Sequence, residues 1–377
     1  MNKIWWVCLG PVVLLHAAHA ATPITATQRD QVIEKLPLIT KNRAASQTTT
    51  LANPEAAALA ARELITAARQ TGDTRYWGRA QAMLTPWWNK PDAPTDLMVL
   101  QATIQQGRHE FSEARSVLTR ALKLNPAQAQ GWLNLATLER LAGNYARALQ
   151  ACEAVGQAGQ ALYAQACQLE TQSLQGKTNE ARAGLQTLIS AADNASTRSW
   201  LLSLLAESEE RAGKDGAALK AYQSSLKQES DLYTSIALSD LLLRTGKHQD
   251  ALKTLTGLPA TDAVLLRQAT AKKRAGDPTW AELRQTLRER QAELKRRGDK
   301  LELHGREEAL VALWLDEDFA SAVTMAERNL DLQKEPIDWW VAIQSARAAS
   351  DLPALARLRG EMQRIGIVDA RIQGEKS

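Results

Sequence analysis

Three histidines follow the first twenty residues of the chain, and their spacing is not that of a metal site. His109, His248 and His304 are far apart, and none has a histidine four residues away or a Glu-x-x-His partner. A closed zinc site needs three or four converging ligands. The sequence also contains no Gly-x-Ser-x-Gly elbow, phosphate-binding loop or dinucleotide fingerprint. We therefore expect that the protein binds no metal or cofactor and that it is not an enzyme.

Two cysteines, Cys152 and Cys167, are spaced to form a disulfide. Their midpoint falls at Gly159, between two segments with helical spacing. If those segments form an antiparallel hairpin, the two sulfur atoms lie at the same level along the two helices. The third cysteine, Cys8, lies in the first twenty residues, which we expect to be removed. The remaining pair suggests a disulfide in an oxidising compartment, whereas the alternative is two buried free thiols. Closing this short loop would stabilise the fold by about 3 kcal/mol.

The first twenty residues have the pattern of a secretory signal peptide. Lys3 precedes an apolar run over residues 4–15, and the segment ends in Ala18-His19-Ala20. A membrane-spanning helix needs about 20 apolar residues, so this run is too short to span a bilayer. We expect cleavage after Ala20 and a periplasmic or secreted protein with no transmembrane segment thereafter. An uncleaved anchor is the alternative.

The composition predicts an all-α protein. The 377 residues include 64 alanines and 53 leucines, both among the best helix formers. Strands favour β-branched and aromatic residues instead. The net charge is only +4, which argues against a dedicated nucleic-acid binder.

Alanines recur along the chain with a period near 34 residues, the spacing of helix-turn-helix solenoid units. The gaps between successive members range from 30 to 41 residues. This set, the alanine ladder, comprises Ala80, Ala114, Ala148, Ala181, Ala218, Ala251, Ala281, Ala322 and Ala356. A turn is expected in the middle of each unit. Five of these turns contain a glycine (Gly143, Gly176, Gly213, Gly246 and Gly276), and His109, Glu317 and Asp351 take its place in others.

The clearest unit resembles a tetratricopeptide repeat (TPR). Trp132, Leu135, Ala148 and Cys152 stand at the Trp, Leu, Ala and Phe positions of that repeat, and the last unit begins again with Trp340. The resemblance implies a TPR-like α-solenoid of about nine helical hairpins in a right-handed superhelix, over residues 54–366. An N-terminal helix and flexible linker (21–53) would precede it, with Asn53 as helix cap, and a C-terminal tail (367–377) would follow.

The repeat also predicts a ligand groove, because first helices line the concave surface of TPR proteins. Tyr163, Trp200 and Tyr233 each lie 18 residues before a ladder alanine, so they occupy one equivalent place in three successive units. They could form an aromatic row for a peptide or a sugar. Alternatively, each ring replaces a missing packing tryptophan. The charged positions predicted to face inward are Arg140, Glu207, Glu210, Asp240 and Arg244.

A periplasmic scaffold that binds a peptide or protein partner in this groove is the leading functional hypothesis, with envelope assembly or secretion as its setting. The alternative is a polysaccharide-associated TPR protein that supports exopolysaccharide synthesis or export, for which the aromatic row would bind glycan. A third hypothesis, an enzyme that uses the groove, would require convergent titratable groups in a closed pocket.

Overall fold

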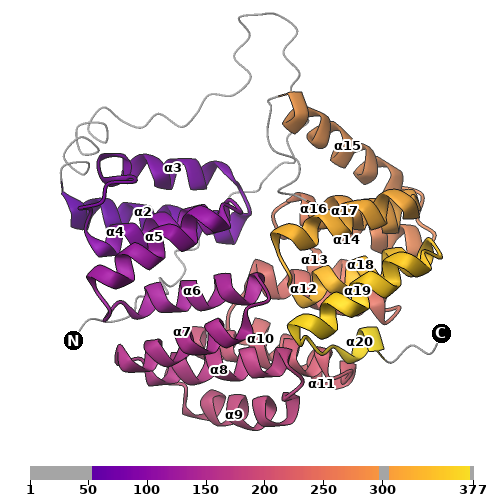
Figure 1. The fold of residues 1–377 in the computed structure, drawn as a ribbon. Helices are drawn as coiled ribbons and strands as arrows, with labels where there is room; N and C mark the ends of the chain where they lie inside the picture. Colours follow the sequence, from indigo (N-terminus) through magenta and orange to yellow (C-terminus); the bar gives the residue numbers. More distant parts are fainter. Residues whose placement is uncertain (1–52, 297–304, 374–377) are drawn as a thin grey trace, which may run out of the picture.

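The computed structural model describes residues 53–296 and 305–373, and this part of the chain is helical throughout, with no strand (Figure 1). It contains nine successive helix pairs and one short terminal helix. The predicted all-α, TPR-like solenoid of about nine hairpins is thereby confirmed. The predicted signal peptide, N-terminal helix and most of the linker lie outside the described residues.

Each pair consists of a first helix and a second helix. The pairs are α2 (Pro54–Thr71) with α3 (Arg75–Met83), α4 (Thr95–Gly107) with α5 (Phe111–Leu124), α6 (Ala129–Leu141) with α7 (Tyr145–Gln157), α8 (Ala161–Leu174) with α9 (Thr178–Ala191), α10 (Ala195–Arg211) with α11 (Asp215–Gln228), α12 (Leu232–Arg244) with α13 (His248–Leu255), α14 (Asp262–Arg274) with α15 (Trp280–Arg296), α16 (Gly305–Val311) and its π-helical end η3 (Ala312–Asp316) with α17 (Phe319–Leu332), and α18 (Pro336–Ala348) with α19 (Leu352–Ile365). A 3-10 turn, η1 (Thr85–Trp87), follows α3, and α20 (Ala370–Gln373) ends the described chain.

Small residues lie where the helices of a pair approach each other. Seven ladder alanines, from Ala80 to Ala251 and Ala322, have no exposed surface. The other two predictions are wrong: Ala281 and Ala356 are exposed, and Ala354 takes the buried position in α19. A shift of two residues rotates a helical position by about 200°, which is enough to turn it from the core to the solvent.

The predicted local signals at helix ends are confirmed in most units. The Asn53 side chain caps α2 by accepting hydrogen bonds from the amides of Glu55 (2.9 Å) and Ala56 (3.2 Å). Gly143 adopts the left-handed conformation, with φ of 75°, that ends a helix without strain at Cβ. In the last unit Ser350, not Asp351, has this conformation. Asp351 caps α19 instead, accepting from the Ala354 amide at 2.9 Å.

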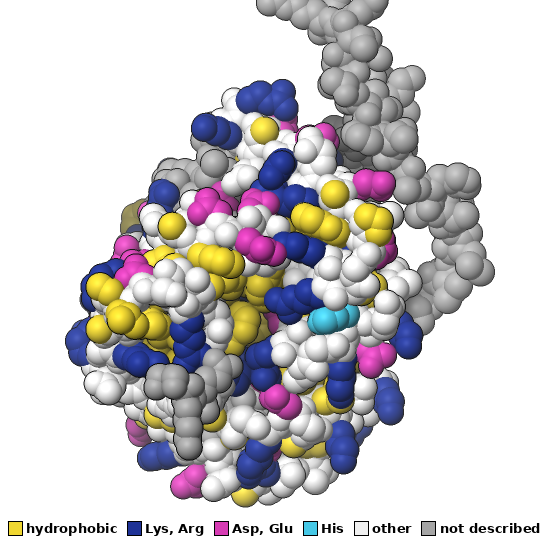
Figure 2. Space-filling view, turned by 90° about the vertical axis from the view of Figure 1, so that its right-hand side faces the viewer, with side chains coloured by type: hydrophobic (Ala, Val, Ile, Leu, Met, Phe, Trp, Pro, Cys, Tyr) yellow, Lys and Arg dark blue, Asp and Glu magenta, His cyan; other side chains and the backbone are white. Residues whose placement is uncertain are grey.

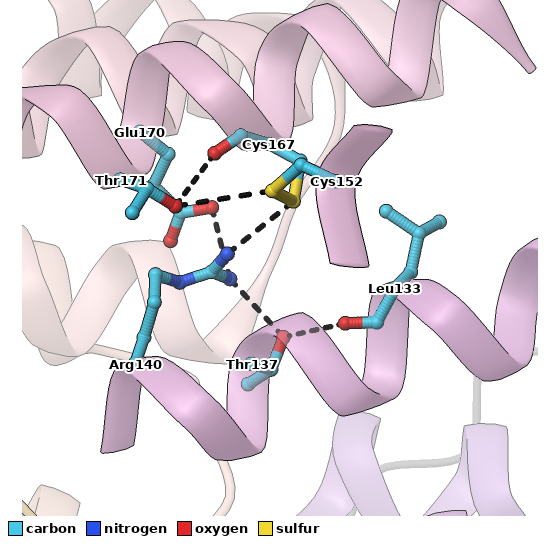
Figure 3. The surroundings of a disulfide bond; sticks show 7 residues. All are labelled: Leu133, Thr137, Arg140, Cys152, Cys167, Glu170 and Thr171. Carbon is cyan, nitrogen blue, oxygen red and sulfur yellow. Dashed lines mark hydrogen bonds and ion pairs between the residues drawn. A yellow bond between two sulfur atoms is a disulfide. The ribbon is translucent and has the colours of Figure 1, made fainter. Parts of the chain in front are cut away.

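A disulfide joins Cys152 in α7 to Cys167 in α8, as predicted (Figure 3). The two helices form a hairpin around Gly159, and the Cα atoms of the cysteines are 5.5 Å apart. Arg140 lies against this bond: its guanidinium contacts the Cys167 sulfur at 3.6 Å and pairs with Glu170 at 3.0 Å. The disulfide is buried and fixes two neighbouring units relative to each other.

The segment predicted as a C-terminal tail is in fact packed against the solenoid up to residue 373. Ile367 and Ile372 are each 3% exposed. The Val368 amide donates a hydrogen bond to the carbonyl of Leu174 at 2.8 Å, and Arg371 pairs with Glu210 at 2.8 Å. The tail assignment was therefore wrong for residues 367–373, because burying two isoleucines outweighs the polar appearance of the terminal sequence.

Two further contacts bring distant repeats together. The Lys334 amide donates to the carbonyl of Leu141 at 2.8 Å, which joins the connection between the eighth and ninth hairpins to the third hairpin. At the other end, the side chains of Thr261 and Leu232 occupy the space where a Cβ atom on Gly72 would lie, so the first hairpin lies against the sixth and seventh. The solenoid thus turns tightly enough for repeats far apart in sequence to touch. We call these contacts, together with those of residues 367–373, the closure.

Replacing both cysteines by serine should lower the free energy of unfolding by about 3 kcal/mol, because the unfolded chain regains the entropy of an open 15-residue loop. Chemical denaturation measures this. A reducing agent should cause the same loss in the wild type and none in the double variant. Equal stability of the oxidised wild type and the variant would contradict the prediction.

Candidate functional site

The three aromatic residues predicted to form a row do not form a continuous platform. The rings of Tyr163 and Trp200 pack together, with centroids 5.6 Å apart, and both are half-buried. Tyr233 is 57% exposed and instead donates its hydroxyl to Glu207 at 3.0 Å. Two of the rings therefore fill the space between units, as in the alternative interpretation, and one faces the solvent.

The charged residues predicted to line the groove are mostly used to join repeats. Glu210 accepts hydrogen bonds from the Tyr222 hydroxyl (3.1 Å) and from Arg244 of the next first helix (3.2 Å). Asp240 pairs with buried Arg267 at 2.8 Å, although burial still raises the pKa of this carboxyl. Since these bridges run from one first helix to the next, we interpret them as structural, and they leave little charge for a ligand.

Glu207 lies at the centre of the inner surface among other carboxyl groups. Burial raises the pKa of Glu207 to about 7, and the nearby carboxylates of Glu170 and Glu335 also raise it. Arg211 opposes this shift at 3.8 Å, as does the hydrogen bond from Tyr233. In return, the Glu207 carboxylate raises the pKa of the Tyr233 phenol well above its ordinary value. Glu207 therefore changes charge near neutral pH.

A cavity of about 940 Å³ opens where the C-terminal ends of α12, α14, η3 and α18 meet α20. We call it the axial cavity. Figure 2 views the corresponding side of the molecule, where hydrophobic and basic side chains surround a depression. Of its twelve lining residues, only Arg244 was predicted as a site residue. The other basic members are Lys273, Arg274, Arg347 and Arg371.

Arg274 lines the axial cavity at the C-terminal end of α14. Its guanidinium donates one hydrogen bond, to the carbonyl of Leu243 at 3.0 Å, and lies 5.4 Å from the centre of the Trp314 ring. It makes no ion pair with any carboxylate in the described part of the chain. Burial lowers the pKa of Arg274, and Asp240 offsets this only in part. Lys273, by contrast, pairs with Glu317.

Part of the cavity lining is apolar and lies beside Arg274. The rings of Trp314 and Trp340 meet edge to face, with centroids 6.1 Å apart, and Leu313 and Phe319 continue this wall. Trp340, predicted as a packing residue of the last unit, is only half-buried and faces this space. The cavity therefore combines a basic side with an aromatic side.

No group of three or more His, Cys, Asp or Glu residues suited to a metal ion occurs in residues 53–296 and 305–373. His248 begins α13, and burial and Arg274 lower its pKa, whereas His109 packs against Phe111. His304 is outside the described residues. None of the described helices is long and apolar enough to cross a membrane.

No protein-family model matches the chain, and no curated protein sequence does. Among solved structures, a Rap protein complexed with competence and sporulation factor is similar, with a TM-score of 0.53, 9% identity and 90% of each chain covered. Human IFIT1, solved as a dimer with m7Gppp-AAAA, has a TM-score of 0.50 and 12% identity, with 86% of this chain and 78% of that chain covered. Both are TPR-like helical-repeat proteins. At these identities the similarity defines the fold: the chain is a TPR-like α-solenoid.

Replacing Glu207 by Gln should change how stability depends on pH. Because the folded state raises the pKa of this carboxyl, its contribution is fully present below the unfolded value and is lost as pH rises through about 7. The variant should exceed the wild type by about 1 kcal/mol at pH 8, a value reduced for partial solvent exposure, and match it near pH 4.

Thermal or chemical unfolding at several pH values measures this difference. Glu153→Gln, an exposed position on α7, is the matched control and should follow the wild type at every pH. A constant difference between Glu207→Gln and the wild type from pH 5 to pH 8 would show that Glu207 does not titrate in this range.

Proposed function

We propose that the protein is an exported TPR-like scaffold that binds a peptide or protein partner along its inner surface, in envelope assembly or secretion. The observation that carries this proposal is that the inner surface already binds a non-helical segment, residues 367–369, of the chain itself. A surface that holds one segment through its main chain has the means to hold another.

The main-chain acceptors come from the ends of the first helices. The last four carbonyl groups of a helix have no partner within it. Here the Leu174 carbonyl accepts from the Val368 amide at 2.8 Å, and the Leu141 carbonyl accepts from Lys334 in the same way. Such contacts depend little on side-chain identity, which suits a surface that receives a peptide backbone.

The fold and the disulfide support the remaining parts of the proposal. The Rap structure carries competence and sporulation factor, so proteins of this fold include binders of a partner. The buried Cys152–Cys167 bond is typical of proteins that function in an oxidising compartment, in agreement with the signal-like residues 1–20.

Site-specific photocrosslinking in cells tests this function. A photoreactive phenylalanine derivative at Tyr233, which is exposed on the first helix α12, should yield an adduct with a defined polypeptide. The same group at Lys220, exposed on the second helix α11, is the matched control and should yield none.

Removing residues 2–20 should abolish the adduct, because the chain would not reach the compartment of its partner. Adducts that form at Lys220 but not at Tyr233 would contradict binding at the inner surface. An adduct that proves to be carbohydrate would favour the polysaccharide hypothesis instead, and an adduct that persists without residues 2–20 would contradict export.

A further inference from the structure

We propose that the axial cavity binds an acidic segment of the partner peptide, with a side-chain carboxylate of the ligand on Arg274 and an aliphatic or aromatic neighbour against Trp314 and Trp340. This inference rests on the proposed function and assigns a ligand chemistry to one part of the inner surface.

The charges on the cavity wall favour an anion. Five lining residues are basic and one, Glu317, is acidic. Arg244 and Arg371 share Glu210, at 3.2 and 2.8 Å, and Lys273 pairs with Glu317. Arg274 has no carboxylate within ion-pair distance in the described chain, and only the more distant Asp240 offsets its charge there in part.

Hydrogen-bond donors among the residues that line the cavity favour a ligand that supplies acceptors. Arg274 uses one of its five N–H groups on the Leu243 carbonyl. The Arg244 Nε and Gln344 Nε2 atoms are buried and have no hydrogen-bond partner among the described residues. Buried donors are normally paired, and an ionised carboxylate is an acceptor only. A ligand carboxylate would thus complement the N–H groups that Arg274 does not use within the described residues.

The amount of free charge distinguishes a carboxylate from a phosphate. A phosphate monoester carries about 1.5 to 2 negative charges near neutral pH. Arg244, Lys273 and Arg371 already contact carboxylates, and Arg347 donates a hydrogen bond to the carbonyl of Ile372 at 2.9 Å. Arg274 has no carboxylate partner among the described residues. A single carboxylate on Arg274 matches this charge and can be bound through two parallel hydrogen bonds.

The size and position of the cavity favour a peptide. Its volume, about 940 Å³, is at the upper end of the range of about 300 to 1,000 Å³ in which small-molecule sites lie. Arg371 lines the cavity and belongs to the segment that the inner surface already holds, so the cavity continues that binding surface. The Trp314 and Trp340 rings provide an apolar contact area beside the charge.

Isothermal titration and tryptophan fluorescence test the proposal with the purified full chain. The probes are acetylated and amidated pentapeptides that carry one or two Asp residues between Leu or Phe residues, so that no terminal carboxylate contributes. We expect saturable binding with a change in tryptophan emission. Peptides with Asn in place of Asp should bind at least tenfold more weakly.

Arg274→Gln should weaken binding of the acidic peptides at least tenfold, and Arg274→Lys should restore part of it because the charge returns. Arg359→Gln, at an exposed position on α19, is the matched control and should bind as the wild type does. Thermal melting shows whether each variant is folded, and the Lys variant keeps the test valid if the Gln variant is not.

Several results would overturn the inference. They are equal affinity for Asp and Asn peptides, unchanged affinity in Arg274→Gln, and the absence of any binding at millimolar peptide. Tighter, Arg274-dependent binding of inorganic phosphate or adenosine triphosphate would assign the site to phosphate. A photocrosslinked partner whose binding ignores Arg274 would leave the proposed function standing while this inference fails.

Discussion

Close packing at small residues is the constraint on which the structure depends. At seven ladder positions, from Ala80 to Ala322, an alanine without exposed surface lies between helices, where a longer side chain would separate them. A hairpin built in this way exposes an apolar face that only the next hairpin can cover. The repeat period, the stacking and the tight superhelix follow from that requirement.

The closure then decides what the inner surface can bind. Residues 367–373 occupy part of the inner surface. Glu210 and Asp240, which were predicted to face inward, form ion pairs with arginines of the solenoid and of residues 367–373. Binding capacity is left where these bridges end, at the axial cavity. There Arg274 lies beside the Trp314 ring and makes no ion pair within the described residues. The contacts that stabilise the solenoid therefore leave few charged side chains of the described inner surface without a partner.

The features that the sequence predicted are local ones. The Asn53 cap, the Gly143 turn and the pairing of Cys152 with Cys167 depend on residues within about one repeat, so spacing alone identified them. The closure could not be predicted, because Arg371 and Glu210 are separated by 161 residues. Their contact depends on the cumulative rotation of several hairpins. Arginines do recur in the last turns of first helices, but basic residues at helix C-termini are also expected from the helix dipole alone.

The central claim is that the inner surface of the solenoid holds a segment of main chain through the ends of its first helices. Hydrogen–deuterium exchange at the Val368 amide tests it most directly, because that amide is outside every helix and its described acceptor is the Leu174 carbonyl. The account predicts protection comparable to that of amides in the adjoining helices α8 and α10. Exchange at the rate of an unprotected amide, with α8 and α10 still protected, would contradict it.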